Sequence, residues 1–133
     1  MNVDRLERLA KLLDQQTDAC PVKFDLSGWG EAKKVEENIC GTQACAVGLA
    51  CLSGEFDSDG LFFERGTFQN PSEIYPIFNG QSSWGAVNSF FGLTHAQSMH
   101  LFDMCSYDNT RGASAAHEVA GRIRTMIHEH KGE

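Results

Sequence analysis

The chain of 133 residues is long enough for one domain, and its 41% hydrophobic content, with nine Phe and two Trp, can fill a single core. Its formal charge of −7 argues against a protein that binds a phosphate backbone, because such proteins usually present a basic patch. We therefore expect one domain, residues 1–133, that does not contact nucleic acid directly and whose acidic surface meets a basic partner or imitates a polyanion.

The first part of the chain predicts one helix and one strand. Apolar residues recur at helical spacing over residues 3–15, with charged residues between them, which predicts an amphipathic helix. Pro21 starts a new segment, and the alternation of apolar and polar residues over 22–26 predicts a short, half-buried strand. Residues 31–39 are largely charged and favour no more than a weak helix or a loop.

Residues 42–52 form the most apolar run of the chain and predict a buried central helix. Thr42 occupies the expected N-cap position, so that Cys45 falls in the first turn. Small residues, among them Gly48, leave room for neighbouring elements to approach the backbone closely. Gly54 is a plausible residue for ending the helix.

The next segments predict a hairpin and a loop. Residues 61–63 and 67–68 are separated by three polar or small residues and fit a small hairpin. Pro71 and Pro76 predict irregular structure over the core, anchored by apolar side chains at 74–78.

Three helices are predicted in the remaining chain. Apolar spacing predicts a helix from Ser83 that Gly92 stops, and Thr94 with Gln97 has the spacing of a capping box at the start of a second helix. A last helix, capped by Ser114, carries one apolar stripe. The predicted fold is mainly α: a small, single-domain helical fold around a buried central helix (about 42–52), with a minor β-hairpin or short sheet.

Cys45 is the sharpest candidate for catalysis. A thiol in the first turn of a helix can have a lowered pKa, and thiol proteases place their nucleophile there. His95 is the best candidate base, although no histidine stands beside an obvious orienting residue. The alternative is that Cys45 is a packed structural residue, because free cysteine is commonly buried.

Metal and cofactor sites are not predicted. Cys40 and Cys45 are not followed by a second pair at zinc-ligand spacing, and Cys105 with His100 could complete a site only through tertiary proximity. Cys51 adds no such spacing. We therefore leave open whether Cys40, Cys45 and Cys51 are structural, reactive or metal-binding, and expect no cofactor.

Four aromatic residues are candidates for binding a partner protein, because Trp and Tyr dominate interface hot spots. If they are not exposed together, they are ordinary core residues. They are Trp29, Tyr75, Phe78 and Trp84.

Location is predicted from what the sequence lacks. Residues 1–4 show no basic segment followed by an apolar one, and no apolar run approaches the ~20 residues of a membrane helix. Five cysteines, at spacings unlike a disulfide framework, fit a reducing compartment. A cytoplasmic protein without a membrane segment is expected.

Several segments together resemble a group of short, uncharacterised proteins of bacteria and their phages. They are Cys-Gly-Thr-Gln-Ala-Cys-Ala-Val-Gly at 40–48, Phe-Phe-Gly-Leu at 90–93, Leu-Phe at 101–102 and Val-Ala-Gly-Arg-Ile at 119–123. The resemblance implies a shared fold and a phage or mobile-element setting, which is compatible with a host-directed or anti-defence protein.

The expected function is therefore that of a non-catalytic protein-binding module whose partner is a host protein. The alternative is a thiol-dependent enzyme with Cys45 as its nucleophile. Oligomeric state and partner identity are left open.

Overall fold

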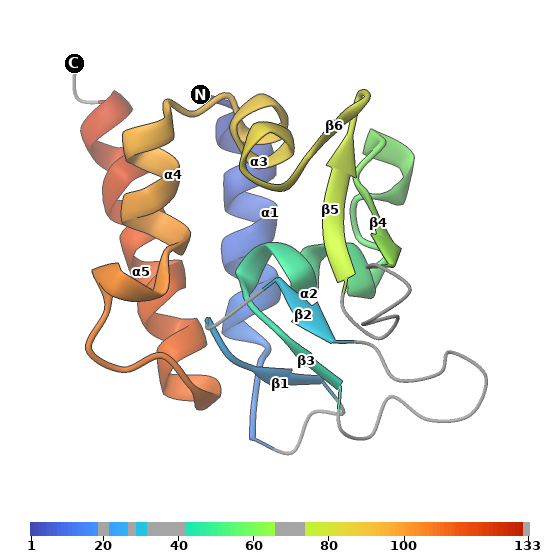
Figure 1. The fold of residues 1–133 in the computed structure, drawn as a ribbon. Coiled ribbons are helices and arrows are strands. Elements are labelled where there is room, and N and C mark those ends of the chain that lie inside the picture. The colour runs from blue at the N-terminus through green and yellow to red at the C-terminus, as the bar shows by residue number, and fades with distance from the viewer. Residues whose placement is uncertain (19–21, 27–28, 32–41, 66–73, 132–133) are drawn as a thin grey trace.

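The computed structural model describes residues 1–18, 22–26, 29–31, 42–65 and 74–131. In chain order the elements are α1 (Val3–Asp14), β1 (Val22–Phe24), β2 (Gly30–Glu31), β3 (Thr42–Ala44), α2 (Ala46–Ser53), β4 (Phe62–Arg65), β5 (Ile74–Phe78), β6 (Gln81–Ser82), α3 (Ser83–Phe91), α4 (His95–Phe102) and α5 (Gly112–Lys131), with short 3-10 helices at Asp57–Asp59 and Met104–Ser106. Helices α4 and α5 lie on one side, the sheet of β4, β5 and β6 lies on the other, and α1 and α2 lie between them (Figure 1). The prediction of a mainly α fold with minor sheets is confirmed.

Helices α1 and α5 pack along each other and form one wall of the core. Helix α1 is capped by Asn2, whose side-chain oxygen accepts a hydrogen bond from the backbone N–H of Arg5 at 3.1 Å. The apolar stripes predicted for both helices are buried, including Leu9 of α1 and Ile123 of α5. The predicted helix over 3–15 is therefore confirmed, with its last residue at Asp14.

The buried central helix is also confirmed, but the start predicted at Thr42 is wrong. Thr42–Ala44 form β3, which pairs with β1 in parallel on one side and with β2 antiparallel on the other. These pairings satisfy the backbone in an extended conformation, so α2 begins at Ala46 with Cys45 as its N-cap. All six residues from Ala46 to Cys51 are buried.

The second sheet departs from the prediction. Strand β4 pairs with β5, in the segment predicted to be a loop, and β5 also pairs with β6. Strand β6 pairs only with Ile77 and Phe78, so at Pro76 one side of β5 is without a strand partner in the described chain, and the missing N–H can be tolerated there. The partner predicted for 61–63, residues 67–68, lies outside the described residues.

Helices α3 and α4 follow the prediction closely. Gly92 ends α3 with a positive φ of 63°. At the start of α4, the Thr94 hydroxyl accepts from the Gln97 N–H at 3.1 Å and the Gln97 side chain accepts from the Thr94 N–H at 2.9 Å, which confirms the capping box.

Helix α5 begins two residues before the predicted cap, Ser114. The Asp18 carboxylate accepts a hydrogen bond from the N–H of Ala113 at 2.9 Å, so a residue distant in sequence caps the helix. The Ser114 hydroxyl instead accepts from the Asn109 side chain at 2.9 Å.

Candidate functional site

The Cys45 thiol lies at the start of α2 but is enclosed. Cys45 is 3% exposed, and its Sγ accepts a weak hydrogen bond from the N–H of Gly48 at 3.5 Å. Burial raises the pKa of Cys45 to about 11, because desolvation outweighs the nearby backbone N–H groups that favour the thiolate. The environment therefore acts against the lowered pKa that a catalytic thiol in the first helical turn would need.

Cys51, six residues after Cys45 and within α2, is also buried. Its thiol donates to the carbonyl oxygen of Phe62 at 3.6 Å, and burial raises its pKa to about 12. Both α2 cysteines thus fill space in the core as neutral thiols at neutral pH. Cys105, by contrast, is exposed.

His95, the candidate base, is the first residue of α4 and is exposed. Its ring lies 6.0 Å from the ring of Trp84, at an angle of 83°. In the described part of the chain, no hydrogen bond links His95 to Cys45. His95 therefore packs beside an aromatic ring, and no carboxylate among the described residues orients its imidazole.

Trp29 and Trp84 come together from different parts of the chain. Their ring centroids are 4.8 Å apart at an angle of 62°, an edge-to-face arrangement, and both side chains are half-buried. Together with His95 they form an aromatic patch, the name used below for Trp29, Trp84 and His95. Two of the four predicted binding residues therefore share one place on the surface.

Helix α2 fixes the position of Trp29. The backbone N–H of Cys45 donates to the carbonyl oxygen of Trp29 at 3.3 Å. A Cβ placed on Gly48 would lie only 1.7 Å from the same oxygen, so this close approach requires glycine. The small residue noted in the predicted helix thus lets the Trp29 backbone sit against α2.

Tyr75 and Phe78 do not join the aromatic patch. The Tyr75 hydroxyl donates to the Glu64 carboxylate at 3.1 Å, across β5 and β4, and this hydrogen bond raises the pKa of Tyr75. Phe78 packs against Phe90, with ring centroids 4.9 Å apart, and is a half-buried edge of the core. The four aromatic residues predicted as one binding set are therefore divided.

A charged cluster that the sequence did not single out joins α1 to the turn after α2. Asp59 accepts from Arg8 at 3.0 Å and from Arg5 at 3.3 Å. These hydrogen bonds, chiefly the one from Arg8, hold the pKa of Asp59 below its usual value. The arginines also lie over aromatic rings, with Arg5 4.2 Å from the Phe90 centroid and Arg8 4.6 Å from the Phe56 centroid. The acidic turn could be seen in the sequence, but its partners could not, because they lie about fifty residues away.

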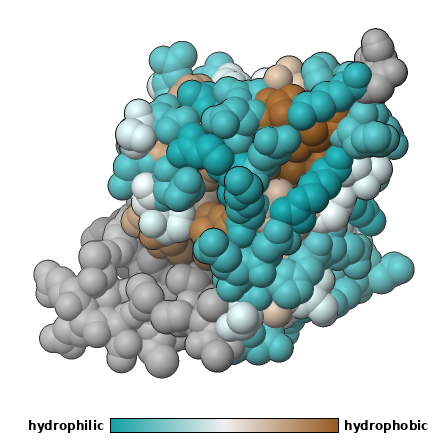
Figure 2. Space-filling view, turned by 180° about the vertical axis from the view of Figure 1, so that it is seen from behind, coloured by the Kyte–Doolittle hydropathy of each residue, from teal (hydrophilic) through white to brown (hydrophobic). Residues whose placement is uncertain are grey.

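No group of three His, Cys, Asp or Glu side chains among the residues that the structure describes is placed to hold a metal ion. None of the helices that these residues form has the length and apolar composition needed to cross a membrane. The face turned away in Figure 1 is mostly hydrophilic, interrupted by small apolar areas (Figure 2).

Comparison with known proteins adds no identification. No family model matches this chain, and neither a curated protein nor a solved structure is significantly similar to it.

Proposed function

We propose that this protein is a non-catalytic module that binds another protein, and that the aromatic patch is its contact surface. The observation that carries the proposal is the half-buried Trp29–Trp84 pair, 4.8 Å between centroids, with the exposed His95 beside it. Tryptophan side chains that keep part of their surface in water while held rigidly by the fold are typical anchors of protein interfaces.

The state of Cys45 favours binding over catalysis. A thiol that is 3% exposed, with a pKa raised to about 11, is neutral at pH 7 and shielded from a substrate. A nucleophilic thiol needs the opposite environment, one that is open and stabilises the thiolate.

The expected partner is a protein that presents basic side chains. Lys and Arg are attracted to the faces of Trp rings, and the formal charge of −7 steers a basic surface toward this protein. The resemblance to phage proteins supports a host protein as that partner, and a role against a host defence system belongs to the same proposal.

The test is affinity capture from a bacterial lysate with matched variants, followed by quantitative mass spectrometry. Trp84→Ala and His95→Ala remove parts of the aromatic patch. Phe62→Ala is the control, because Phe62 is 48% exposed but lies on β4, outside the patch. Circular dichroism establishes that each variant is folded before capture.

The wild type and the Phe62→Ala variant should capture one or more basic proteins from the lysate. The Trp84→Ala and His95→Ala variants should fail to capture them. Removing a hot-spot tryptophan should weaken binding roughly thirtyfold or more, because such residues contribute about 2 kcal/mol or more. Equal capture by all four proteins would contradict the assigned surface. Turnover of a thioester or peptide substrate that requires Cys45 would contradict the non-catalytic function.

A further inference from the structure

Helices α1 and α5 are joined by ion pairs at two levels. Near one end, the Lys131 ammonium lies 3.5 Å from the Glu7 carboxylate. Near the other, Arg124 donates two hydrogen bonds to the Asp14 carboxylate. Since residue numbers rise along one helix as they fall along the other, the helices are antiparallel and a middle level lies between the two pairs.

At the middle level, one basic side chain has no acidic partner. Residues 7, 11 and 14 share one face of α1, so Lys11 falls between the two pairs. Opposite it on α5 is the apolar Ile127. Lys11 makes no hydrogen bond or ion pair with any other described residue.

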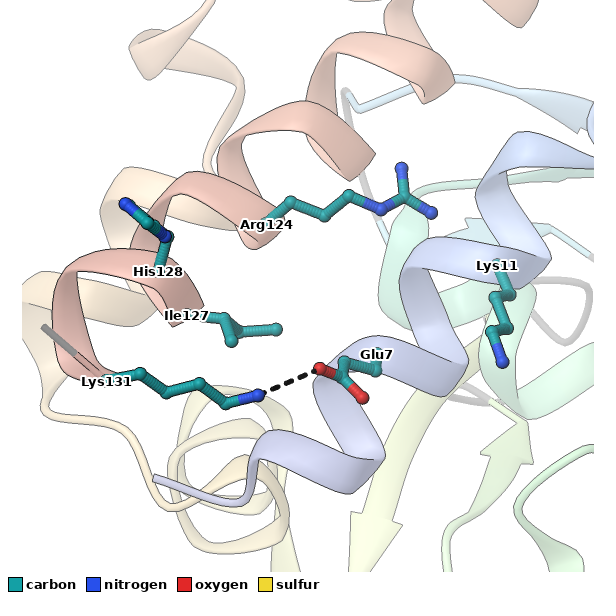
Figure 3. Close-up of a pocket in the computed structure, with 6 residues that line it drawn as sticks. All are labelled: Glu7, Lys11, Arg124, Ile127, His128 and Lys131. Carbon is teal, nitrogen blue, oxygen red and sulfur yellow. Dashed lines mark hydrogen bonds and ion pairs between the residues drawn. The ribbon is translucent and has the colours of Figure 1, made fainter.

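A cavity of about 290 Å³ opens at this level, lined by Glu7, Lys11, Arg124, Ile127, His128 and Lys131. In the close-up, Ile127 points into the gap between the helices, Lys131 reaches across it to Glu7, and His128 points away from α1 (Figure 3). The cavity thus has an apolar floor and a rim of charged groups carried by two helices.

Positive groups outnumber negative ones around this cavity. Lys11, Arg124 and Lys131 supply three basic side chains, whereas Glu7 is the one carboxylate among the lining residues, and Asp14 pairs with Arg124 from outside them. An ammonium group has three N–H donors, so Lys11 keeps all of its donors and Lys131 keeps two after its bond to Glu7. This surplus of donors stands out in a chain with a formal charge of −7.

The helix dipoles favour both lysine positions, but they give Lys11 no direct partner. Cations in the last turn of α5, such as Lys131, are expected because they interact favourably with its C-terminal carbonyl groups. Lys11 lies in the last turn of α1, where the C-terminal carbonyl groups of that helix also favour a cation. It remains the unpaired group at the middle level.

We propose that this cavity binds a tetrahedral oxyanion of the size of phosphate, either free or as the terminal group of a small phosphomonoester. The oxyanion would accept hydrogen bonds from Lys131 on α5 and from Lys11 on α1, whose side chain would turn toward the gap from the direction it takes in Figure 3. With the Arg124 charge nearby, it would complete the row of opposite charges between the helices. The site is open to solvent, so the affinity expected is weak, on the order of millimolar.

The test is a titration with inorganic phosphate, at constant ionic strength, followed by amide chemical shifts in NMR. Lys11→Gln removes the charge but keeps most of the aliphatic stem, and Lys11→Arg restores a charge. Lys23→Gln is the control, because Lys23 is an exposed lysine of β1 that does not line this cavity. A parallel titration with glycerol 3-phosphate distinguishes free phosphate from a phosphomonoester.

The expected result is saturable shifts of amides near residues 7–11 and 124–131, weakened roughly fivefold or more by Lys11→Gln and preserved in the other two variants. Tighter binding of glycerol 3-phosphate would support a phosphomonoester, and equal binding would support free phosphate. Shifts that do not saturate, or that are the same in Lys11→Gln and the wild type, would overturn the proposal. Lys11 has no partner to lose, so the thermal midpoint of Lys11→Gln should match the wild type and separate lost binding from lost folding.

Discussion

Substitution of Gly48 by alanine tests how α2 positions Trp29. In an ordinary helix, Gly→Ala stabilises by about 1 kcal/mol, because alanine has the higher helix propensity. At Gly48, however, the new methyl carbon would lie 1.7 Å from the Trp29 carbonyl oxygen and 3.2 Å from the Ala44 Cβ. The opposite effect is therefore expected here.

The size of the effect follows from what must move. The Trp29 backbone would have to withdraw by about 1.5 Å to restore an ordinary contact, and the 3.3 Å hydrogen bond from the Cys45 N–H would then be broken. Overpacking of a core costs about 1–3 kcal/mol, and a buried N–H left without its acceptor costs about 1 kcal/mol more. After subtraction of the helix-propensity gain, we expect Gly48→Ala to lower the free energy of unfolding by about 1–3 kcal/mol.

The assay is urea unfolding followed by tryptophan fluorescence and by circular dichroism. The chain has two tryptophans, Trp29 and Trp84, so the native emission spectrum should also change if their pair is disturbed. Gly121→Ala is the matched control, because Gly121 is an exposed glycine of α5 whose added Cβ would meet nothing within 4 Å. It should raise the free energy of unfolding by about 0.5–1 kcal/mol.

One result would refute this reasoning. If Gly48→Ala were as stable as the wild type, or stabilised the protein as Gly121→Ala does, the Trp29 backbone would not lie against α2. Helix α2 would then not be what holds the aromatic patch in place.

The remaining predictions concern buried thiols, an ion pair and a hydroxyl. Iodoacetamide at pH 8 should label the exposed Cys105 in the native protein but spare Cys45 and Cys51, whose pKa values are raised to about 11 and about 12. Peptide mass spectrometry with a denatured control measures the labelling. Equal labelling of Cys45 and Cys105 in the native protein would contradict the prediction. Asp59→Asn should lower the free energy of unfolding by about 1 kcal/mol at pH 7. Because the folded-state pKa of Asp59 lies below its ordinary value of 3.8, the carboxylate contributes stability above pH 3.8 and loses it as the pH falls through the folded-state pKa. The difference between Asp59→Asn and the wild type in urea unfolding should therefore shrink on acidification, and a constant difference would argue against the ion pairs. Tyr107→Phe should lower the free energy of unfolding by about 1 kcal/mol, because the buried Tyr107 hydroxyl donates to the backbone carbonyl oxygen of Leu101 in α4 at 2.6 Å. An unchanged thermal midpoint would contradict that hydrogen bond.

Elements predicted correctly from the sequence are those whose stabilising contacts lie close together in the chain. The amphipathic stripe of α1, the Thr94–Gln97 capping box and the stop at Gly92 each depend on residues within a few positions of one another. Such patterns can be recognised without knowing what packs against them. The buried character of α2 is also evident from its composition.

The errors arise where distant segments satisfy the backbone. Thr42–Ala44 would continue α2 on local grounds, but pairing with β1 and β2 holds these residues extended. Pro76 suggested a loop, yet β4 supplies a partner on one side of β5. The cap of α5 comes from Asp18, which no local pattern connects with Ala113.

The candidate site shows the same division. The sequence identified Cys45 as a residue at a helix start and Trp29 and Trp84 as interface candidates, because residue type and local spacing determine those properties. The tertiary structure decided that Cys45 is buried with a raised pKa, that the two tryptophans meet, and that Lys11 stands unpaired between two ion pairs. The exclusion of water from a group and the charges around it depend on every element that packs against that group. Those elements come together only when the whole chain has folded.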